Sequence, residues 1–132
     1  MLPIPTNIKL HKKSKVLDLE YANEVHQLSC EYLRVYSPSA EVRGHGKGQE
    51  VLQTGKSEVG IENIEASGNY GLKLCFDDGH DTGIYTWNYL HELCINQESY
   101  WDDYLQRMHR AGASRVKHAN VVQLMPGTKN TP

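Results

Sequence analysis

The chain has 132 residues, and its acidic and basic side chains nearly balance at a formal charge of −2. That length fits one domain that buries roughly two-thirds of its unfolded surface, so a core forms without disulfides or metal. The charge balance excludes a general nucleic-acid binder, which needs a strongly basic face. No run approaches the roughly 20 apolar residues of a membrane span.

The cysteines indicate a reducing compartment. There are three, Cys30, Cys75 and Cys94, widely spaced and without a C-x-x-C motif. An odd number of scattered cysteines suits the cytosol better than a disulfide framework. The first ten residues also lack the charged start and apolar run of a signal peptide. We therefore expect a cytoplasmic protein without a membrane partner.

Alternating apolar residues predict three strands in the first part of the chain. A short helix follows them, because Ser29 is a good N-cap and Pro38 ends the helix. The predicted elements are strands Asn7–His11, Val16–Glu20 and Val25–Leu28 and a helix Cys30–Tyr36. Arg34 and Tyr36 on this helix predict a partner surface, since Arg and Tyr are common anchors. The alternative is a helix whose aromatic side chains pack inward.

An irregular segment, Ser37–Lys56, follows the first helix and is rich in glycine. Arg43, His45 and Lys47 lie beside these glycines, so converging backbone N–H groups and positive charge predict an anion-binding or partner-binding loop. The alternative is a long surface connection whose glycines serve turns. A nucleotide-hydrolysing P-loop is excluded, because Glu50 stands where the motif needs glycine.

The second half of the chain repeats the order of strand, turn, strand and helix. Val59–Ala66 is predicted as a bulged strand, because its apolar spacing slips between Ile61 and Ile64. The next predicted strand is the one in which Leu72, Leu74 and Phe76 alternate; a turn at Asp77, Asp78 and Gly79 leads to a strand Gly83–Tyr85. Two helices follow: one from Trp87 to about Cys94, capped by Thr86, and a last helix that starts after Asn96 or Ser99 and ends near Gly112.

The last helix and the residues after it differ in pattern. Trp101, Tyr104, Leu105 and Met108 fall at i, i+3, i+4 and i+7, an amphipathic face that predicts core packing. From Ser114 the chain becomes polar and unpatterned. We therefore expect one domain over residues 1–113 and a flexible tail over residues 114–132.

The two halves align without gaps at an offset of 57 (74 − 17 and 90 − 33). Leu17, Leu19, Ser29, Tyr32 and Leu33 fall on Leu74, Phe76, Thr86, Tyr89 and Leu90. The pattern indicates two hairpin–helix units, either through duplication or because each such unit needs a cap and two apolar anchors. It predicts an α+β, two-layer fold: a mostly antiparallel sheet of hairpins with short helices packed on one face.

Two stretches carry a resemblance to a known family. EYLRVYSPSAEVRGHG (Glu31–Gly46) and GNYGLKLCFDDGHDTGIYTWNYL (Gly68–Leu90) resemble the bacterial proteins of the domain-of-unknown-function 971 (DUF971) family. That family shares its fold with the N-terminal domain of gamma-butyrobetaine hydroxylase. The resemblance runs from about Ile8 to Ala113, nearly all of the expected domain.

The resemblance implies an accessory role. In the hydroxylases this domain precedes a separate domain with the iron- and 2-oxoglutarate-dependent chemistry, and here only a tail is expected after Ala113. The family domain is also found attached to P-loop ATPases of the iron–sulfur carrier type. We therefore expect a non-enzymatic binding module in iron or iron–sulfur cofactor metabolism, with such an ATPase as its protein partner.

The resemblance also bears on metal. In the hydroxylases three cysteines and one histidine hold a structural zinc; the histidine matches His80, and the cysteine positions fall on Ser37, Ser39 and Val42. Serine and valine supply no thiolate, so we expect this zinc site not to be intact.

Two interpretations of the Asp-rich turn stay open. His80 and Asp81, helped by His45, would form a mixed imidazole and carboxylate site for divalent iron or zinc. Alternatively, the turn is solvated and His80 bonds to backbone or to Tyr85.

Overall fold

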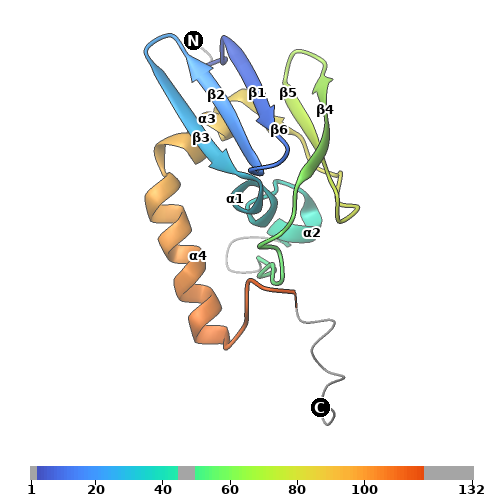
Figure 1. Ribbon diagram of the computed structural model, residues 1–132, viewed down its shortest axis with the longest axis vertical. Coiled ribbons are helices and arrows are strands. Elements are labelled where there is room, and N and C mark those ends of the chain that lie inside the picture. Colours follow the sequence, from blue (N-terminus) through green and yellow to red (C-terminus); the bar gives the residue numbers. More distant parts are fainter. Residues whose placement is uncertain (1–2, 45–49, 118–132) are drawn as a thin grey trace.

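The computed structural model describes residues 3–44 and 50–117. It contains two antiparallel three-stranded sheets and short helices, which confirms the predicted α+β class. In Figure 1 the blue strands β1–β3 and the green strands β4 and β5 stand side by side above α1 and α2. The elements are β1 (Asn7–His11), β2 (Val16–Tyr21), β3 (Glu24–Ser29), α1 (Cys30–Val35), α2 (Ala40–Arg43), β4 (Ile61–Ser67), β5 (Gly71–Phe76), β6 (Tyr85–Thr86), α3 (Trp87–Ile95) and α4 (Gln97–Ala111).

The first sheet has the order β1-β2-β3 and follows the predicted pattern. Leu17 and Leu28 lie opposite each other and are fully buried. The predicted cap is confirmed, because the Ser29 hydroxyl accepts the backbone N–H of Tyr32 at 3.0 Å. Alternation and capping are local rules, so this half of the fold is readable from sequence.

The second sheet, β4-β5-β6, is less regular. The predicted bulge is present, since the register shifts between Ile61 and Asn63. The predicted strand Gly83–Tyr85 is wrong at its start, because β6 holds only Tyr85 and Thr86. Gly83 has a φ of 89° and lies so close to the Ser39 backbone that a Cβ atom would clash with it. The segment before β6 therefore packs on another loop instead of pairing with β5.

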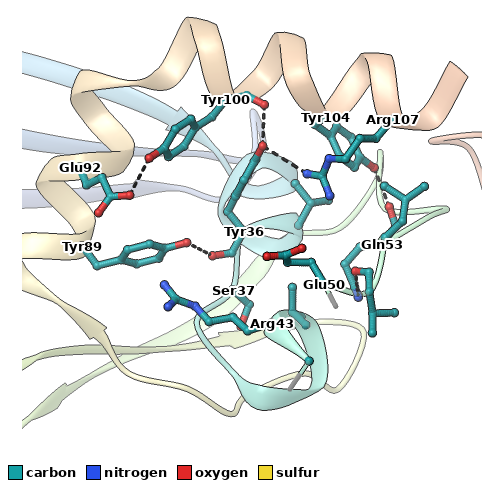
Figure 2. Close-up of a pocket in the computed structure, with 15 residues that line it drawn as sticks. Tyr36, Ser37, Arg43, Glu50, Gln53, Tyr89, Glu92, Tyr100, Tyr104 and Arg107 are labelled. Atoms are coloured by element: carbon teal, nitrogen blue, oxygen red, sulfur yellow. Dashed lines mark hydrogen bonds between the residues drawn. The ribbon is translucent and has the colours of Figure 1, made fainter. Parts of the chain in front are cut away.

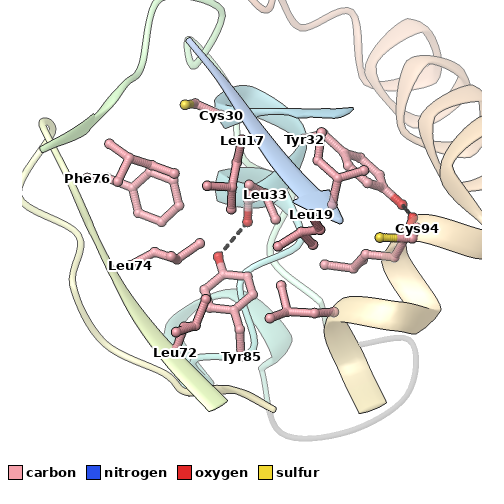
Figure 3. Close-up of a cluster of buried hydrophobic side chains, with 14 of the residues drawn as sticks. Leu17, Leu19, Cys30, Tyr32, Leu33, Leu72, Leu74, Phe76, Tyr85 and Cys94 are labelled. Atoms are coloured by element: carbon pink, nitrogen blue, oxygen red, sulfur yellow. Dashed lines mark hydrogen bonds between the residues drawn. The ribbon is translucent and has the colours of Figure 1, made fainter. Parts of the chain in front are cut away.

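The two sheets share one hydrophobic core with α1 and α3. Figure 3 shows side chains from β2 and β5 meeting around Leu33 and Tyr85, whose hydroxyl donates to the Leu33 carbonyl. The fully buried hydrophobic residues of this core are Leu17, Leu19, Leu28, Cys30, Leu33, Tyr85, Leu90 and Leu93. Because both hairpins contribute, neither unit has a complete core of its own.

The predicted apolar face of α4 is only partly buried. Tyr104 and Met108 are buried and form a second small cluster with Val35. Leu105, predicted to pack inward, is 38% exposed. The helix ends as predicted at Gly112, which adopts a left-handed conformation with φ of 61°. The contact stripe is narrower than the sequence pattern suggested because the cluster that α4 joins is small.

The packed part of the chain continues beyond the predicted boundary at Ala113. The carbonyls of Ser114 and Arg115 accept hydrogen bonds from the backbone of Gly55 and Ser57, each at 2.9 Å. Arg115 also donates to both carboxylate oxygens of the buried Glu31, at 2.7 and 2.8 Å. A buried carboxylate needs such a counter-charge, and the sequence pattern did not reveal it. The predicted tail beyond residue 117 lies outside the described residues.

Candidate functional site

The structure brings His80 to the two serines singled out in the sequence. The Nε2 atom of His80 lies 2.8 Å from the Ser37 hydroxyl and 3.4 Å from the Ser39 hydroxyl. Its Nδ1 atom lies 3.7 Å from the carboxylate of Glu41. Val42, the third matched position, is buried on α2. Of the four positions that match the zinc ligands of the hydroxylases, His80, Ser37 and Ser39 therefore lie within contact distance of one another.

Local backbone contacts fix the His80 turn. The Phe76 N–H donates to the His80 carbonyl at 2.9 Å, and the His80 N–H donates to the Asp78 carboxylate at 3.2 Å. Gly83 then brings the chain against the Ser39 backbone. Turn chemistry predicted from the aspartates is therefore present, and it also holds His80 inward.

The residues around His80 do not fit a structural zinc. Two hydroxyls and a valine stand where thiolates would be needed. Residues 3–44 and 50–117 hold no group of three or more His, Cys, Asp or Glu arranged for a metal ion. Asp81 is exposed, and His45 lies outside the described residues. A mixed site that uses these two residues with His80 stays a prediction.

His80 is buried, and its environment favours the neutral ring. Burial lowers the pKa of His80 below its ordinary value of 6.5, and the nearby Arg34 guanidinium lowers it further. Ser37 is 1% exposed, and its hydroxyl also accepts the Ser39 N–H at 3.3 Å. A serine buried and held in this way serves as a structural hydrogen-bonding group.

Arg34, predicted as a partner residue, points into the molecule. It is 7% exposed, and its guanidinium donates to Asp78 and to the Gln53 side chain, each at 2.9 Å. Lys56 adds a 2.6 Å contact to the same Asp78 oxygen. Burial alone would raise the pKa of Asp78, but Lys56, the His80 N–H and Arg34 together outweigh burial and lower the pKa to about 2. Arg34 therefore ties α1 to the Asp-rich turn.

A cavity of about 520 Å³ opens beside this network, between the end of α1, α2, α3, α4 and the segment 50–53. Figure 2 shows Tyr36 at its centre, with Tyr100 and Arg107 on one side and Tyr89 and Arg43 on another. We call it the tyrosine–arginine pocket. The described residues that line it are Val35, Tyr36, Ser37, Val42, Arg43, Gly44, Glu50, Val51, Leu52, Gln53, Tyr89, Glu92, Tyr100, Tyr104 and Arg107.

The four phenol groups of the pocket all donate to protein acceptors. Tyr36 donates to the Tyr100 carbonyl, Tyr89 to the Tyr36 carbonyl and Tyr104 to the Gln53 carbonyl, at 2.6–2.8 Å. Tyr100 donates to the Glu92 carboxylate at 2.6 Å, which together with burial raises its pKa to about 12. Burial also raises the pKa values of the other three. The phenols are therefore fixed walls, not groups that exchange protons near neutral pH.

Two arginines stack on these walls. The Arg43 guanidinium lies 4.8 Å from the centre of the Tyr89 ring, and the Arg107 guanidinium lies 5.8 Å from that of Tyr36. Such contacts hold the planar cation in place. Arg107 also pairs with Asp103 at 3.1 Å.

Part of this pocket was predictable from the sequence. Arg43 and Tyr36 were predicted as binding residues and line the pocket, whereas Lys47 and His45 lie outside the described residues. Tyr89, which comes from the second hairpin–helix unit, and the residues of α4 were not predicted as part of a site. A signal for the α4 side was present, because Tyr100, Tyr104 and Arg107 stand at i, i+4 and i+7 on one helical face.

A second cavity, of about 680 Å³, lies over the segments 54–59 and 112–117. Its described lining contains Lys56, Asp77, Asp78 and Lys117 but no aromatic side chain. Ligand sites are usually lined by apolar and aromatic groups with a few polar ones, so the tyrosine–arginine pocket is the better candidate. None of the described helices has the length and apolar character to cross a membrane.

Comparison with known proteins identifies the family. The family model described as gamma-butyrobetaine hydroxylase-like, N-terminal, matches residues 8–91. Two proteins solved by NMR are similar along nearly their whole length. One is 50% identical with a TM-score of 0.80, covering 96% of this chain and 100% of its own; the other is 47% identical with a TM-score of 0.74, covering 94% and 93%.

A crystal structure from Acidithiobacillus ferrooxidans ATCC 23270 is 34% identical, with a TM-score of 0.58, and covers 69% of this chain and 92% of its own. That protein is of unknown function and belongs to the DUF971 family. A search of the curated proteins finds no match. The family model and the structural relative agree with the resemblance seen in the sequence, and the chain therefore belongs to the gamma-butyrobetaine hydroxylase-like N-terminal (DUF971) family.

Proposed function

We propose that this protein is a non-enzymatic binding module that recognises a protein partner in its tyrosine–arginine pocket. The observation that carries the proposal is the pocket itself, with four tyrosines and two arginines around a space of about 520 Å³. Tyr and Arg dominate the residues that supply most binding energy at protein interfaces. Side chains already fixed by internal hydrogen bonds also lose little conformational freedom when a partner binds.

The state of the reactive side chains supports a binding role over catalysis. The pocket phenols are hydrogen-bonded and have raised pKa values. Cys30 and Cys94 are buried, and burial raises the pKa of Cys94 to about 11, which disfavours the nucleophilic thiolate. The family match likewise covers an N-terminal domain of the hydroxylase type.

The proposed setting is iron or iron–sulfur cofactor metabolism. Its support is the resemblance to family domains found attached to iron–sulfur carrier-type P-loop ATPases, which makes such an ATPase the proposed partner. The metal-binding alternative, with His80 as principal ligand, is tested separately by metal analysis of tag-free protein and of a His80→Ala variant. Equal metal content in the two would contradict that alternative.

Affinity capture from native lysate tests the proposed function. The bait is the full chain, compared with a Tyr100→Ala/Tyr104→Ala variant that opens the pocket and a Tyr70→Ala control at a 72% exposed site outside it. We expect wild type and control to retain one common ATPase and the pocket variant to lose it, with correct folding checked by circular dichroism. Equal retention by all three would refute the pocket, and turnover of a defined substrate by the pure chain would refute a non-enzymatic role.

A further inference from the structure

The chemistry of the pocket specifies what the partner presents, and this step rests on the proposed function. We infer that the pocket binds a single carboxylate next to an aromatic or aliphatic side chain of the partner, with Arg43 as the receptor of the carboxylate. The inference follows from three features: an arginine with no carboxylate partner among the described residues, an apolar floor, and a nearby acidic group that disfavours multiply charged ligands.

Arg43 differs from the other arginines that contact the core. Arg34 pairs with Asp78, Arg107 with Asp103 and Arg115 with Glu31. Among the described residues no carboxylate forms an ion pair with Arg43, whose guanidinium lies over the Tyr89 ring. An arginine restricted by an aromatic ring keeps N–H groups in a fork that matches a carboxylate. The contact with Tyr89 therefore restricts the Arg43 guanidinium before a ligand arrives.

The floor of the pocket is apolar. Val35 and Val42 are 5% and 6% exposed and lie beneath the cavity, and Leu52 lines its side. The rings of Tyr36 and Tyr104 complete the wall. An aromatic or branched aliphatic side chain that enters this space removes its own surface and part of the floor from water. The ligand therefore carries an apolar body beside its charge.

The remaining charges limit the anion to one negative charge. Glu92 also lines the pocket, where its carboxylate accepts the Tyr100 hydroxyl and adds negative charge near the two arginines. Arg107 is in addition neutralised by Asp103. A phosphate ester carries about two negative charges and would meet more repulsion from these acidic groups, whereas a carboxylate carries one and fits the fork of the Arg43 guanidinium. The carboxylate comes either from an acidic side chain or from the end of the partner chain.

The test is an NMR titration of the ¹⁵N-labelled full chain with three probes. N-acetyl-L-phenylalanine presents a terminal carboxylate, N-acetyl-Phe-Asp-amide presents a side-chain carboxylate, and N-acetyl-L-phenylalaninamide is neutral with the same ring. Probes of this size bind with dissociation constants of about 1 mM at typical efficiency per atom. We expect at least one anionic probe to shift the amide signals of Arg43, Leu52 and Gln53, with at least fivefold higher affinity than the neutral probe.

Arg43→Gln and Arg110→Gln separate the pocket charge from charge in general. Both variants lose one positive charge, but Arg110 is exposed on α4 and lies outside the pocket. We expect Arg43→Gln to reduce the affinity for the anionic probe to that for the neutral one, and Arg110→Gln to leave it unchanged.

Equal binding of anionic and neutral probes, or unchanged binding by Arg43→Gln, would overturn the inference while leaving the pocket as a binding site. Absence of any shift at about 10 mM probe, well above the expected dissociation constant, would also overturn it. The proposed function is judged by the capture experiment with the Tyr100→Ala/Tyr104→Ala variant, so the two failures are distinguishable. Whichever anionic probe binds more tightly identifies the source of the carboxylate.

Discussion

The two hairpin–helix units, β2–β3–α1 and β5–β6–α3, share anchors and caps but pair their strands differently. Ser29 and Thr86 cap the two helices in the same way, by accepting the N–H of Tyr32 and Tyr89. In the first unit Val16 lies opposite Ser29, whereas in the second Gly71 lies opposite Thr86. The equivalent of Val16 is position 73 (16 + 57), so the second register is displaced by two residues (73 − 71). An even displacement keeps the same side chains on the core face.

The helices of the two units also exchange equivalent hydrogen bonds. The Tyr32 hydroxyl donates to the Leu93 carbonyl, and the Tyr89 hydroxyl donates to the Tyr36 carbonyl. Both donors and both acceptors are related by the offset of 57 (89 − 32 and 93 − 36). Each unit therefore fixes the end of the other unit's helix, which is the arrangement expected of a pseudo-symmetric pair.

The difference between the units lies in their turns. β2 and β3 are joined at Tyr21 and Glu24 by a tight turn, and they pair along their full length. β5 and β6 are joined by residues 77–84, and β6 keeps only two residues. The longer turn brings Asp78 and His80 to the first unit, where they meet Arg34 and Ser37. The regular unit therefore supplies the scaffold, and the irregular unit supplies the polar groups that join it.

The largest expected effect tests whether the backbone around His80, Ser37, Ser39 and Val42 still has the geometry of a zinc site. A Ser37→Cys/Ser39→Cys/Val42→Cys variant would combine three thiolates with His80, and such sites bind zinc with about 10 kcal/mol or more. We expect one zinc per chain by plasma emission spectrometry and none in wild type. Adding His80→Ala to the triple variant should weaken binding strongly; a triple variant that stays free of zinc would show that the loop geometry has diverged.

The next effect tests whether Leu17 and Leu74, which occupy equivalent positions in the two units, contribute equally to stability. Leu17 and Leu74 are 0% and 1% exposed, so replacing either with alanine leaves a cavity and lowers the free energy of unfolding by about 2–5 kcal/mol. Urea unfolding of the two variants should give losses that agree within about 1 kcal/mol. Val25→Ala, at a 58% exposed site, is the matched control with a small effect. A large disparity between the two leucines would mean that one unit dominates the core.

Removing the charge of Asp78 tests the ion pair between Arg34 and the turn of residues 77–84. Asp78→Asn would leave the buried Arg34 without a carboxylate, a change we expect to cost about 2–3 kcal/mol because the site is partly open to solvent. Asp81→Asn, at an exposed position of the same turn, should change stability by less than about 0.5 kcal/mol. Thermal and urea unfolding measure both, and similar losses would contradict a specific role for the Arg34 pair.

The exchanged tyrosine bonds predict a smaller, paired effect. Tyr32→Phe and Tyr89→Phe each remove one hydroxyl that donates to a carbonyl of the other unit, at a cost of about 1 kcal/mol each. Tyr70→Phe removes a hydroxyl from a 72% exposed side chain and serves as control. If only one of the paired variants loses stability, the two bonds are not equivalent and the pseudo-symmetry is limited to the backbone.

The smallest effect concerns pH. The pKa of folded His80 is lowered by burial and by Arg34, so the unfolded chain takes up a proton more readily. The stability that depends on neutral His80 is present above about pH 6.5 and is lost as pH falls through that value toward the folded pKa. Urea unfolding should therefore give lower stability at pH 5.5 than at pH 7.5, and His80→Gln should flatten this dependence. The pKa of Asp78 is lowered from 3.8 to about 2, so the stability that depends on its carboxylate is lost as pH falls from about 4 toward 2.

Short-range chemistry made much of the fold readable from the sequence. The alternation of apolar and polar residues predicted β1, β2 and β5. The capping hydroxyl groups of Ser29 and Thr86 predicted the starts of α1 and α3, and Gly112 predicted the end of α4. The fixed offset between the halves also predicted two similar units. Each of these signals lies within a few residues of the feature that it predicts, because helix caps, turns and strand periodicity are local properties of the backbone.

The tertiary structure alone decided the short β6, the exposure of Leu105 and the assembly of the pocket. The buried charges show why: Arg34 meets Asp78 across 44 positions and Glu31 meets Arg115 across 84. Such pairs form only once both elements are packed in a low-dielectric interior, where each charge requires the other. Tyr36, Tyr89 and Arg43 likewise come together only because two similar units face each other, and nothing in the local sequence of either unit encodes that meeting.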